Sequence, residues 1–192
     1  MSNDAQTYVD RFKQVSTARV AGVLAEFKIR GQCSGVRAVA AGNGKVCGRA
    51  FTIQFLPCGA PDGRTPNGQI AEYLEDVPAG YVVAIDNRGD LHHSVWDDAM
   101  SERAKKRSLA GVVIDGASGA GASGYPVFSR AASAQSGQDQ VRAEAFNLPI
   151  AIGGVRVECD DILLGDEEGL VVIPRDYIAR VWAAVDALQA KG

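Results

Sequence analysis

The stretch LPIAIGGVRVECDDILLGDEEGLVVIP, residues 148–174, carries the clearest fold signal in the chain. Its first part contains two short apolar runs separated by Gly153-Gly154, a pair that is typical of a turn. Its second part has the same arrangement, since DILLGD and GLVVIP flank a short polar turn. We therefore expect two strands over 148–158 and a β-hairpin over 160–174.

The rest of the chain alternates between helical and extended patterns, and polar segments connect them. Apolar spacing predicts helices at 5–28, 70–77, 94–109 and from Arg175 onward, with Tyr177, Ile178, Val181 and Val185 facing inward in the last. Short β-rich runs predict strands at 48–57, 81–86, 110–115 and 125–130. Ser16 or Thr17 and Ser94 are suitable helix caps, 57–68 resembles a loop, and 131–147 is expected to be irregular and mobile. Helix–strand units followed by a β-rich tail predict one α/β domain over 1–192 with a mixed sheet.

Composition excludes several classes of function. The net charge of −3 over 192 residues argues against nucleic acid as the main partner, because phosphate-binding surfaces usually carry a basic excess. No apolar run approaches the ~20 residues that a membrane helix needs, and the first residues, MSNDAQTYVDRF, lack a signal-peptide pattern. We therefore expect a cytoplasmic protein without a membrane partner. The cysteines (Cys33, Cys47, Cys58 and Cys159) have no zinc-site spacing and are expected to be reduced, with a reactive Cys58 as the alternative.

A glycine-rich segment follows the strand at 110–115 and raises the question of a phosphate site. Gly119, Gly121 and Gly124 in GAGASG fit the dinucleotide pattern G-x-G-x-x-G. That pattern requires a helix directly after the glycines, whose N-terminus holds the pyrophosphate. Here Tyr125-Pro126-Val127-Phe128 follows, and proline pushes its predecessor out of the helical region. The segment therefore does not predict nucleotide binding.

The order AGVVIDGA, GYPVFSR and the tail quoted above resembles the RraA-like family, which contains regulators of ribonuclease E activity and 4-hydroxy-4-methyl-2-oxoglutarate aldolases. STARVAGVLAEFKIRG, GRAFTIQF, VPAGYVVAIDNRG and SVWDD also align, so the resemblance covers nearly the whole chain. It implies a β/β/α swivelling-type sandwich with a mixed sheet, a homotrimer or a dimer of trimers, and a site between subunits. For the aldolases it also implies Mg²⁺ or Mn²⁺, which with an arginine stabilises the enolate of a pyruvate-like oxo acid.

Three departures from the family pattern affect that implied site. The family's Arg-Asp pair after Asp115-Gly116 is absent, because Ala117-Ser118-Gly119-Ala120 follows and the loop is about four residues short. Asp97 replaces a glycine whose amide approaches the substrate carboxylate, and its charge repels an anion. Near the N-terminus, 21–24 reads Ala-Gly-Val-Leu where Ser-Asp-Ala-Leu is usual. A standard metal-dependent aldolase is therefore disfavoured, and we assign no metal ligand.

The remaining polar residues allow two hypotheses. In the first, which we favour, the chain is a divergent enzyme that performs lyase-type or acid–base chemistry on a small polar or carboxylate substrate. Its candidate catalytic residues are Asp98, Asp115, His92 and His93, and its candidate substrate-binding residues are Trp96, Asp97, Ser118, Gly119 and Arg130. In the second, the chain is a non-catalytic trimeric binding or regulatory protein. Regulation of RNA processing through a protein partner rests on the family name alone. These candidates also have structural interpretations. Asp115 can serve as a turn residue, Arg130 can form a surface ion pair, and at most one of the two adjacent histidines can face a site.

Overall fold

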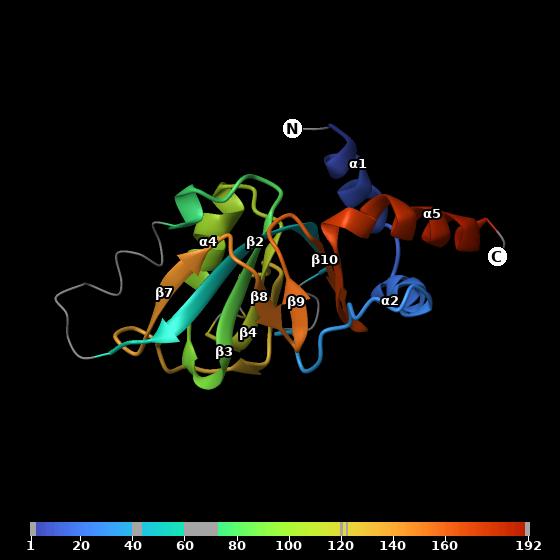
Figure 1. Ribbon diagram of the computed structural model, residues 1–192. Coiled ribbons are helices and arrows are strands. Elements are labelled where there is room, and N and C mark those ends of the chain that lie inside the picture. Colours follow the sequence, from blue (N-terminus) through green and yellow to red (C-terminus); the bar gives the residue numbers. More distant parts are fainter. Residues whose placement is uncertain (1–2, 40–43, 60–72, 120, 122, 191–192) are drawn as a thin grey trace.

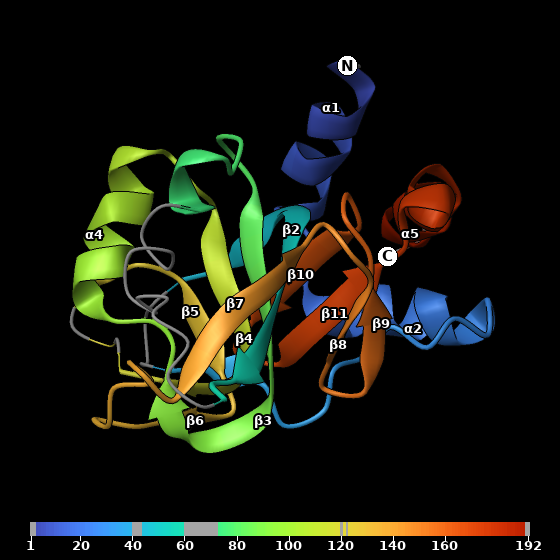
Figure 2. The ribbon, with the colours of Figure 1, turned by 60° about the vertical axis from the view of Figure 1, so that its left-hand side comes forward.

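The computed structural model describes residues 3–39, 44–59, 73–119, 121 and 123–190 (Figure 1). Helices α1 (Asn3–Phe12), α2 (Thr17–Glu26) and α5 (Ile178–Gln189) lie together on one side, and α4 (Asp98–Lys106) lies on the other (Figures 1 and 2). The strands between them are β1 (Arg37–Ala38), β2 (Val46–Pro57), β3 (Val82–Ser94), β4 (Gly111–Ser118), β5 (Val127–Ser129), β6 (Ala131–Ala132), β7 (Val141–Phe146), β8 (Ile150–Ile152), β9 (Val155–Val157), β10 (Ile162–Asp166) and β11 (Gly169–Ile173). Short 3₁₀ turns occupy Tyr73–Glu75 and Arg175–Tyr177.

The main sheet is mixed, as the sequence predicts. Its order is β1-β5-β4-β3-β2-β10-β11, in which β2, β3, β4 and β5 pair in parallel and β10 pairs antiparallel with both β2 and β11. The long strand β2 pairs with β10 through its first half and with β7 through its second half. This arrangement confirms the expected α/β class with a mixed sheet.

Both predicted features of the tail are present. Strands β8 and β9 form a separate antiparallel pair, with Gly153 and Gly154 at positive φ angles of 57° and 77° in the turn. Glycine is favoured there because side chains with a Cβ rarely adopt that backbone conformation. Strands β10 and β11 form the second hairpin, whose Asp166 caps α2 by accepting a hydrogen bond from the Thr17 amide at 2.8 Å.

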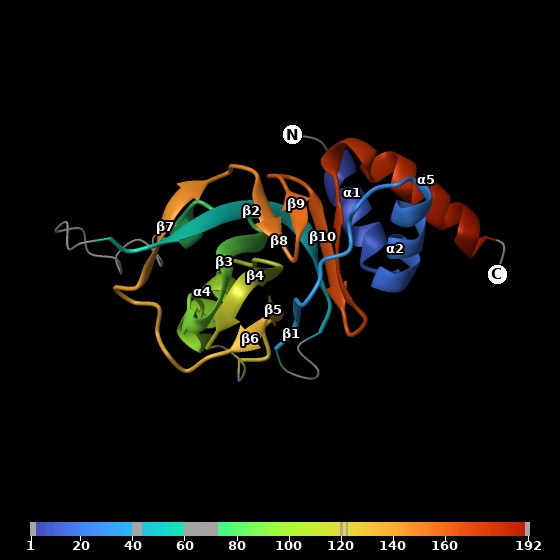
Figure 3. The ribbon, with the colours of Figure 1, turned by 60° about the horizontal axis from the view of Figure 1, so that its bottom comes forward.

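Apolar side chains cover both faces of the sheet, because successive strand residues point to opposite sides. One face is covered by a cluster that contains Ile114 and Trp96, and α4 packs over it. The other face carries a cluster that contains Val113 and the β8–β9 pair. A third cluster joins α1, α2 and α5 to the β10–β11 hairpin, and Figure 3 shows these helices grouped beyond β10. The α4 side and the β8–β9 side of the sheet are thus separate environments.

Several expected boundaries were wrong. The helix expected from Ser94 begins at Asp98, because Asp97 caps it while Ser94 still belongs to β3. The segment 131–147, expected to be irregular, contains β6 and β7, since β7 pairs with β2 and buries Val141 and Ala143. Tyr177 is exposed and Ile178 partly buried, while Val181 and Val185 are buried as expected, because α5 starts only at Ile178.

Other predictions are confirmed or lie outside the described residues. Ser16 caps α2, with its Oγ accepting from the Arg19 amide at 3.4 Å. Most of the loop expected at 57–68 and the first half of the helix expected at 70–77 fall within 60–72, outside the described residues. No helix in the described part of the chain is long and apolar enough to span a membrane.

Candidate functional site

A pocket of about 680 Å³ lies beside the N-terminal end of α4. One wall is the chain that enters and starts this helix, with Trp96, Asp97 and Met100. A second wall is the segment 133–138, and Gly119 contributes from the end of β4. Three of the predicted substrate-binding residues, Trp96, Asp97 and Gly119, therefore line one cavity.

The second wall was missed in the sequence, where it falls in the segment expected to be irregular. Its residues have small or amide side chains that give no motif: Ser133, Ala134, Ser136 and Gln138. Backbone hydrogen bonds fix this wall to the end of β3, since Ser94 N donates to Gln135 O and Gly137 N donates to Ser94 O, both at 2.8 Å. Such pairing depends on the fold, so no local pattern could have revealed it.

Asp97 is both a pocket residue and the cap of α4. Its backbone is extended, and its Oδ1 accepts a hydrogen bond from Met100 N at 2.8 Å. An N-cap carboxylate satisfies a free amide of the first turn and interacts favourably with the helix dipole. Trp96 beside it is buried, donates from its indole N–H to Ser101 Oγ at 2.9 Å and stacks on Tyr125.

Asp98 binds the glycine-rich loop. Its Oδ1 accepts hydrogen bonds from the amides of Gly121 at 3.1 Å and Ser123 at 3.3 Å. From the other end of α4, Lys105 Nζ donates to Ser123 O. In this chain the carboxylate of Asp98 thus holds the loop that replaces the family's Arg-Asp pair.

Asp115 forms an ion pair with Arg130. It is only 6% exposed, accepts from Arg130 Nε and, at 3.3 Å, from Arg130 Nη2, and also accepts from Gly153 N at 2.8 Å. The hydrogen bond to Asp115 raises the pKa of Arg130 above its ordinary value. The two residues therefore join β4, the start of β6 and the β8–β9 turn.

The structure does not bring Asp98 and Asp115 together. Asp115 lies two residues after Val113 in β4, so both side chains point to the same face of the sheet. That face is the one covered by the β8–β9 pair. Trp96, two residues before Asp98, lies in the cluster on the opposite face. Within this chain, Asp98 and Arg130 likewise contact different segments, and Asp115 and Arg130 do not line the pocket.

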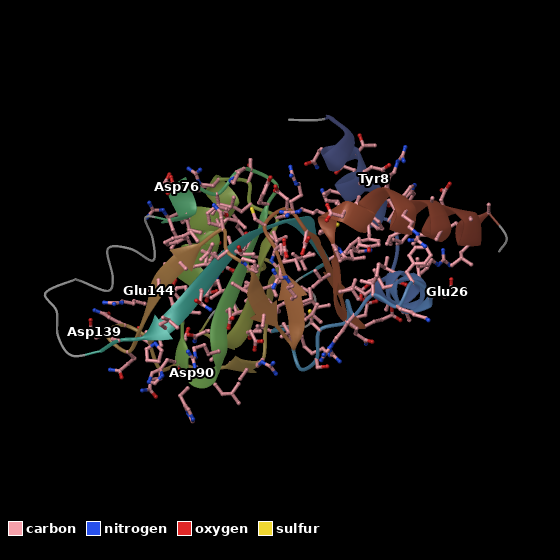
Figure 4. All side chains as sticks on the ribbon, in the orientation of Figure 1. Tyr8, Glu26, Asp76, Asp90, Asp139 and Glu144 are labelled. Atoms are coloured by element: carbon pink, nitrogen blue, oxygen red, sulfur yellow. The ribbon has the colours of Figure 1, made fainter. Side chains whose placement is uncertain are left out.

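The two histidines lie at the end of β3, after a turn in which Arg88 and Gly89 have positive φ angles of 56° and 71°. His93 Nδ1 lies 2.7 Å from Asp90 Oδ2, and the amides of both histidines donate to Asp90 Oδ1. Partial burial raises the pKa of Asp90, but the hydrogen bonds from the His93 ring and from both amides outweigh it, so the pKa lies below its ordinary value. The partner of the histidine is therefore Asp90, labelled in Figure 4 at the lower end of the molecule, and not Asp97 or Asp98.

Ser118 is the last predicted site residue. It is buried at the end of β4, with its Oγ donating to Trp96 O at 3.4 Å, and it supports the pocket wall from behind.

The described residues offer no cluster of acidic side chains for the divalent metal implied by the resemblance. Calcium takes about six to eight oxygen ligands, whereas Mg²⁺ usually keeps several waters and uses one or two carboxylates. Among the described residues no group of three or more His, Cys, Asp or Glu side chains could hold a metal ion. Asp98, which the resemblance aligns with the acidic residue of the family's Trp-Gly-Asp/Glu pattern, already accepts hydrogen bonds from two loop amides.

Known proteins resemble this chain along most of its length. DlpA of Legionella pneumophila is 30% identical over 170 residues, which cover 86% of this chain and 27% of DlpA. A protein of Halalkalibacterium halodurans named "Putative 4-hydroxy-4-methyl-2-oxoglutarate aldolase" is 30% identical over 141 residues, 69% of this chain and 61% of that protein. The chain thus spans about a quarter of the length of the first relative and less than two thirds of the second.

Solved structures confirm the fold. An uncharacterized protein from Pseudomonas syringae superposes with a TM-score of 0.85 at 28% identity, covering 96% of this chain and 84% of that one. Streptomyces coelicolor RraAS2, described as an unusual member of the RNase ES inhibitor RraA protein family, superposes with a TM-score of 0.82 at 27% identity. The match covers 96% of this chain and 93% of that one. A family model described as RraA-like, Aldolase/RraA, matches residues 14–172. With its mixed sheet, its tail hairpins and this match, the chain belongs to the RraA-like family.

Proposed function

We propose that this chain is a ligand-binding member of the RraA-like family that takes a small polar molecule in the α4 pocket and does not perform metal-assisted aldol cleavage. One observation carries the proposal: Asp98 Oδ1 accepts hydrogen bonds from the backbone amides of Gly121 and Ser123. With Oδ1 committed to two loop amides, this carboxylate has less capacity to organise the water shell of a metal. The pocket is lined by the amide side chain of Gln138 and by the hydroxyls of Ser94 and Ser133, which donate to Trp96 O and His92 O and so face a ligand as acceptors, and these groups suit hydrogen-bonded recognition.

The relatives support the same choice only in part. One is named as an aldolase, and another is described as belonging to a family of ribonuclease inhibitors, so the family includes more than one activity. Because fold alone does not fix function, the residues of the site decide between them.

The experiment pairs a binding screen with an activity assay. Thermal-shift measurements with small polar compounds should find ligands that raise the melting temperature, since a ligand that binds only the folded state stabilises it. Ala99→Phe, which fills the pocket from the exposed side of α4, should abolish those shifts. Ala183→Phe makes the same change on an exposed face of α5 outside the pocket and should leave them intact.

The assay is pyruvate release from 4-hydroxy-4-methyl-2-oxoglutarate with Mg²⁺ or Mn²⁺. We expect none above background. Release that is lost on Asp98→Ala would overturn the proposal in favour of an aldolase.

A second function is favoured by the His93–Asp90 pair. A carboxylate 2.7 Å from one imidazole nitrogen fixes the tautomer and orientation of the ring, which leaves Nε2 for proton transfer. The end of β3 that carries His93 also holds the 133–138 wall, which places this pair near the pocket rim. If a ligand from the screen is turned over, His93→Gln should abolish turnover without weakening binding; equal turnover by this variant would exclude the histidine.

We also propose that the chain assembles as a homotrimer or a dimer of trimers. Five large apolar side chains among the described residues are 40–56% exposed and leave apolar surface that assembly would cover: Leu91, Phe146, Leu148, Tyr177 and Leu188. Light scattering should give three or six times the 20.2 kDa mass of the chain. A monomer mass would contradict this assembly.

A further inference from the structure

The charge at the α4 end of the pocket is negative. Helix dipoles place roughly +0.5 of an elementary charge at an N-terminus. Asp97 stands at this one with its carboxylate, whose Oδ1 accepts a hydrogen bond from the Met100 amide. The charge of one carboxylate exceeds the partial charge of the dipole.

Asp97 is the carboxylate that faces a ligand. It lines the pocket and is exposed, and the hydrogen bond that it accepts from Met100 N uses Oδ1. In the part of the chain that the structure describes, no ion pair joins Asp97 to a lysine or arginine. Its Oδ2 can therefore accept a hydrogen bond from a molecule in the cavity.

The positive side chain in the pocket wall, Arg103, is held by an acid outside the pocket. Its Nε and Nη2 donate to Glu75 Oε1 at 3.1 and 2.6 Å. Glu75 also accepts from Arg107 at 2.6 Å, and the hydrogen bond from Arg103 helps to hold the pKa of Glu75 below its ordinary value. Arg103 is thus directed toward the 3₁₀ turn at Tyr73–Glu75, where Arg103 and Arg107 share the carboxylate of Glu75, and no ion pair joins Arg103 to Asp97 among the described residues.

We infer that Asp97 selects the ligand by charge, so that the pocket takes a small hydroxylated molecule bearing a protonated amino group and rejects carboxylates. This inference rests on the proposed binding function and names its ligand class. The protonated amine donates to Asp97, and the hydroxyl group of the ligand meets the second wall, where Ser136 and Gln138 lie. A carboxylate that approached the first turn of α4 would meet Asp97 at close range.

The test uses three probes with one carbon skeleton and different charges: 1-amino-2-propanol (cation), lactamide (neutral) and lactate (anion). Calorimetry at low salt should give affinities that fall in that order for the wild-type protein, with about tenfold between the cation and the anion for an exposed charge pair. Asp97→Asn removes the charge and keeps a good N-cap, so the helix start is preserved. In that variant the three affinities should become equal or reverse their order. The ratio of the lactate affinity to the amine affinity should rise about tenfold over the wild-type ratio.

Controls separate this inference from the function on which it rests. Glu102→Gln removes a carboxylate from α4 outside the pocket and should leave the order unchanged. If lactate binds the wild-type protein as well as the amine does, charge selection by Asp97 is wrong while pocket binding stands. If Asp97→Asn leaves a wild-type preference for the amine unaltered, another group sets that preference and the inference also fails. If Ala99→Phe leaves the binding of all three probes unchanged, the proposed function fails and this inference with it. If none of the three probes binds while the screen finds other ligands, only this inference fails.

Discussion

Removing Arg130 should destabilise the protein, because it leaves the buried carboxylate of Asp115 with the Gly153 amide as its remaining described donor. Breaking a fully buried pair typically costs about 3–5 kcal/mol, whereas exposed pairs contribute about 0–1 kcal/mol. The side chain of Asp115 is 9% exposed and that of Arg130 is 29% exposed, so the pair lies nearer the buried limit. We therefore expect Arg130→Met to cost about 2–3 kcal/mol.

In a chain of 192 residues this cost corresponds to a fall of about 4–12 °C in melting temperature. Asp115→Asn keeps an acceptor for the Gly153 amide and should cost less. The double variant should cost less than the sum, with a coupling of about 1.5 kcal/mol in urea unfolding. Additive losses, or a loss below about 0.5 kcal/mol for Arg130→Met, would refute the structural role that we give to this pair.

Three further results follow from the geometry. Asp98→Ala should speed hydrogen exchange of the Gly121 and Ser123 amides by about tenfold or more, because it removes their acceptor, and unchanged exchange would contradict the loop contact. The pKa of Asp90 is lowered in the fold, so its stabilising contribution is present above the ordinary value of 3.8 and is lost as pH falls through the lower folded value. The difference in unfolding free energy between wild type and Asp90→Asn should therefore shrink in acid. A difference that grows in acid would contradict the lowered pKa. Burial raises the pKa of the Cys33 and Cys47 thiols to about 12, so a thiol reagent should label the partly exposed Cys58 and Cys159 in the native protein and the other two only after unfolding.

Local sequence patterns predicted those parts of the fold that depend on local chemistry. The tail hairpins are visible because glycine turns and short apolar runs stand next to one another in the sequence. The start of α4 was misplaced by four residues, since Ser94 and Asp97 are both good caps and only the continuation of β3 to Ser94 decides between them. Strand β7 was missed because its partner, β2, lies far away in the sequence.

The candidate site was predicted in the same uneven way. Trp96, Asp97 and Gly119, predicted as substrate-binding residues, line one pocket, and their role in binding stays a prediction. Asp115 could not be separated from Asp98 in the sequence, since the face on which a strand residue lies depends on the register of the whole sheet. The histidine partner Asp90 lies three residues away across a turn, and the turn geometry that brings the two side chains together follows from Arg88 and Gly89.

We propose that the carboxylates of Asp98 and Asp115 serve the fold, through the loop amides and through Arg130 and Gly153, and do not bind a metal. Calorimetric titration of chelator-stripped protein with Mn²⁺, with and without oxalate, tests it most directly. We predict no specific one-site binding under either condition and the same result for Asp98→Ala. Tight one-site Mn²⁺ binding that oxalate strengthens and Asp98→Ala abolishes would contradict the claim and restore the metal-dependent aldolase.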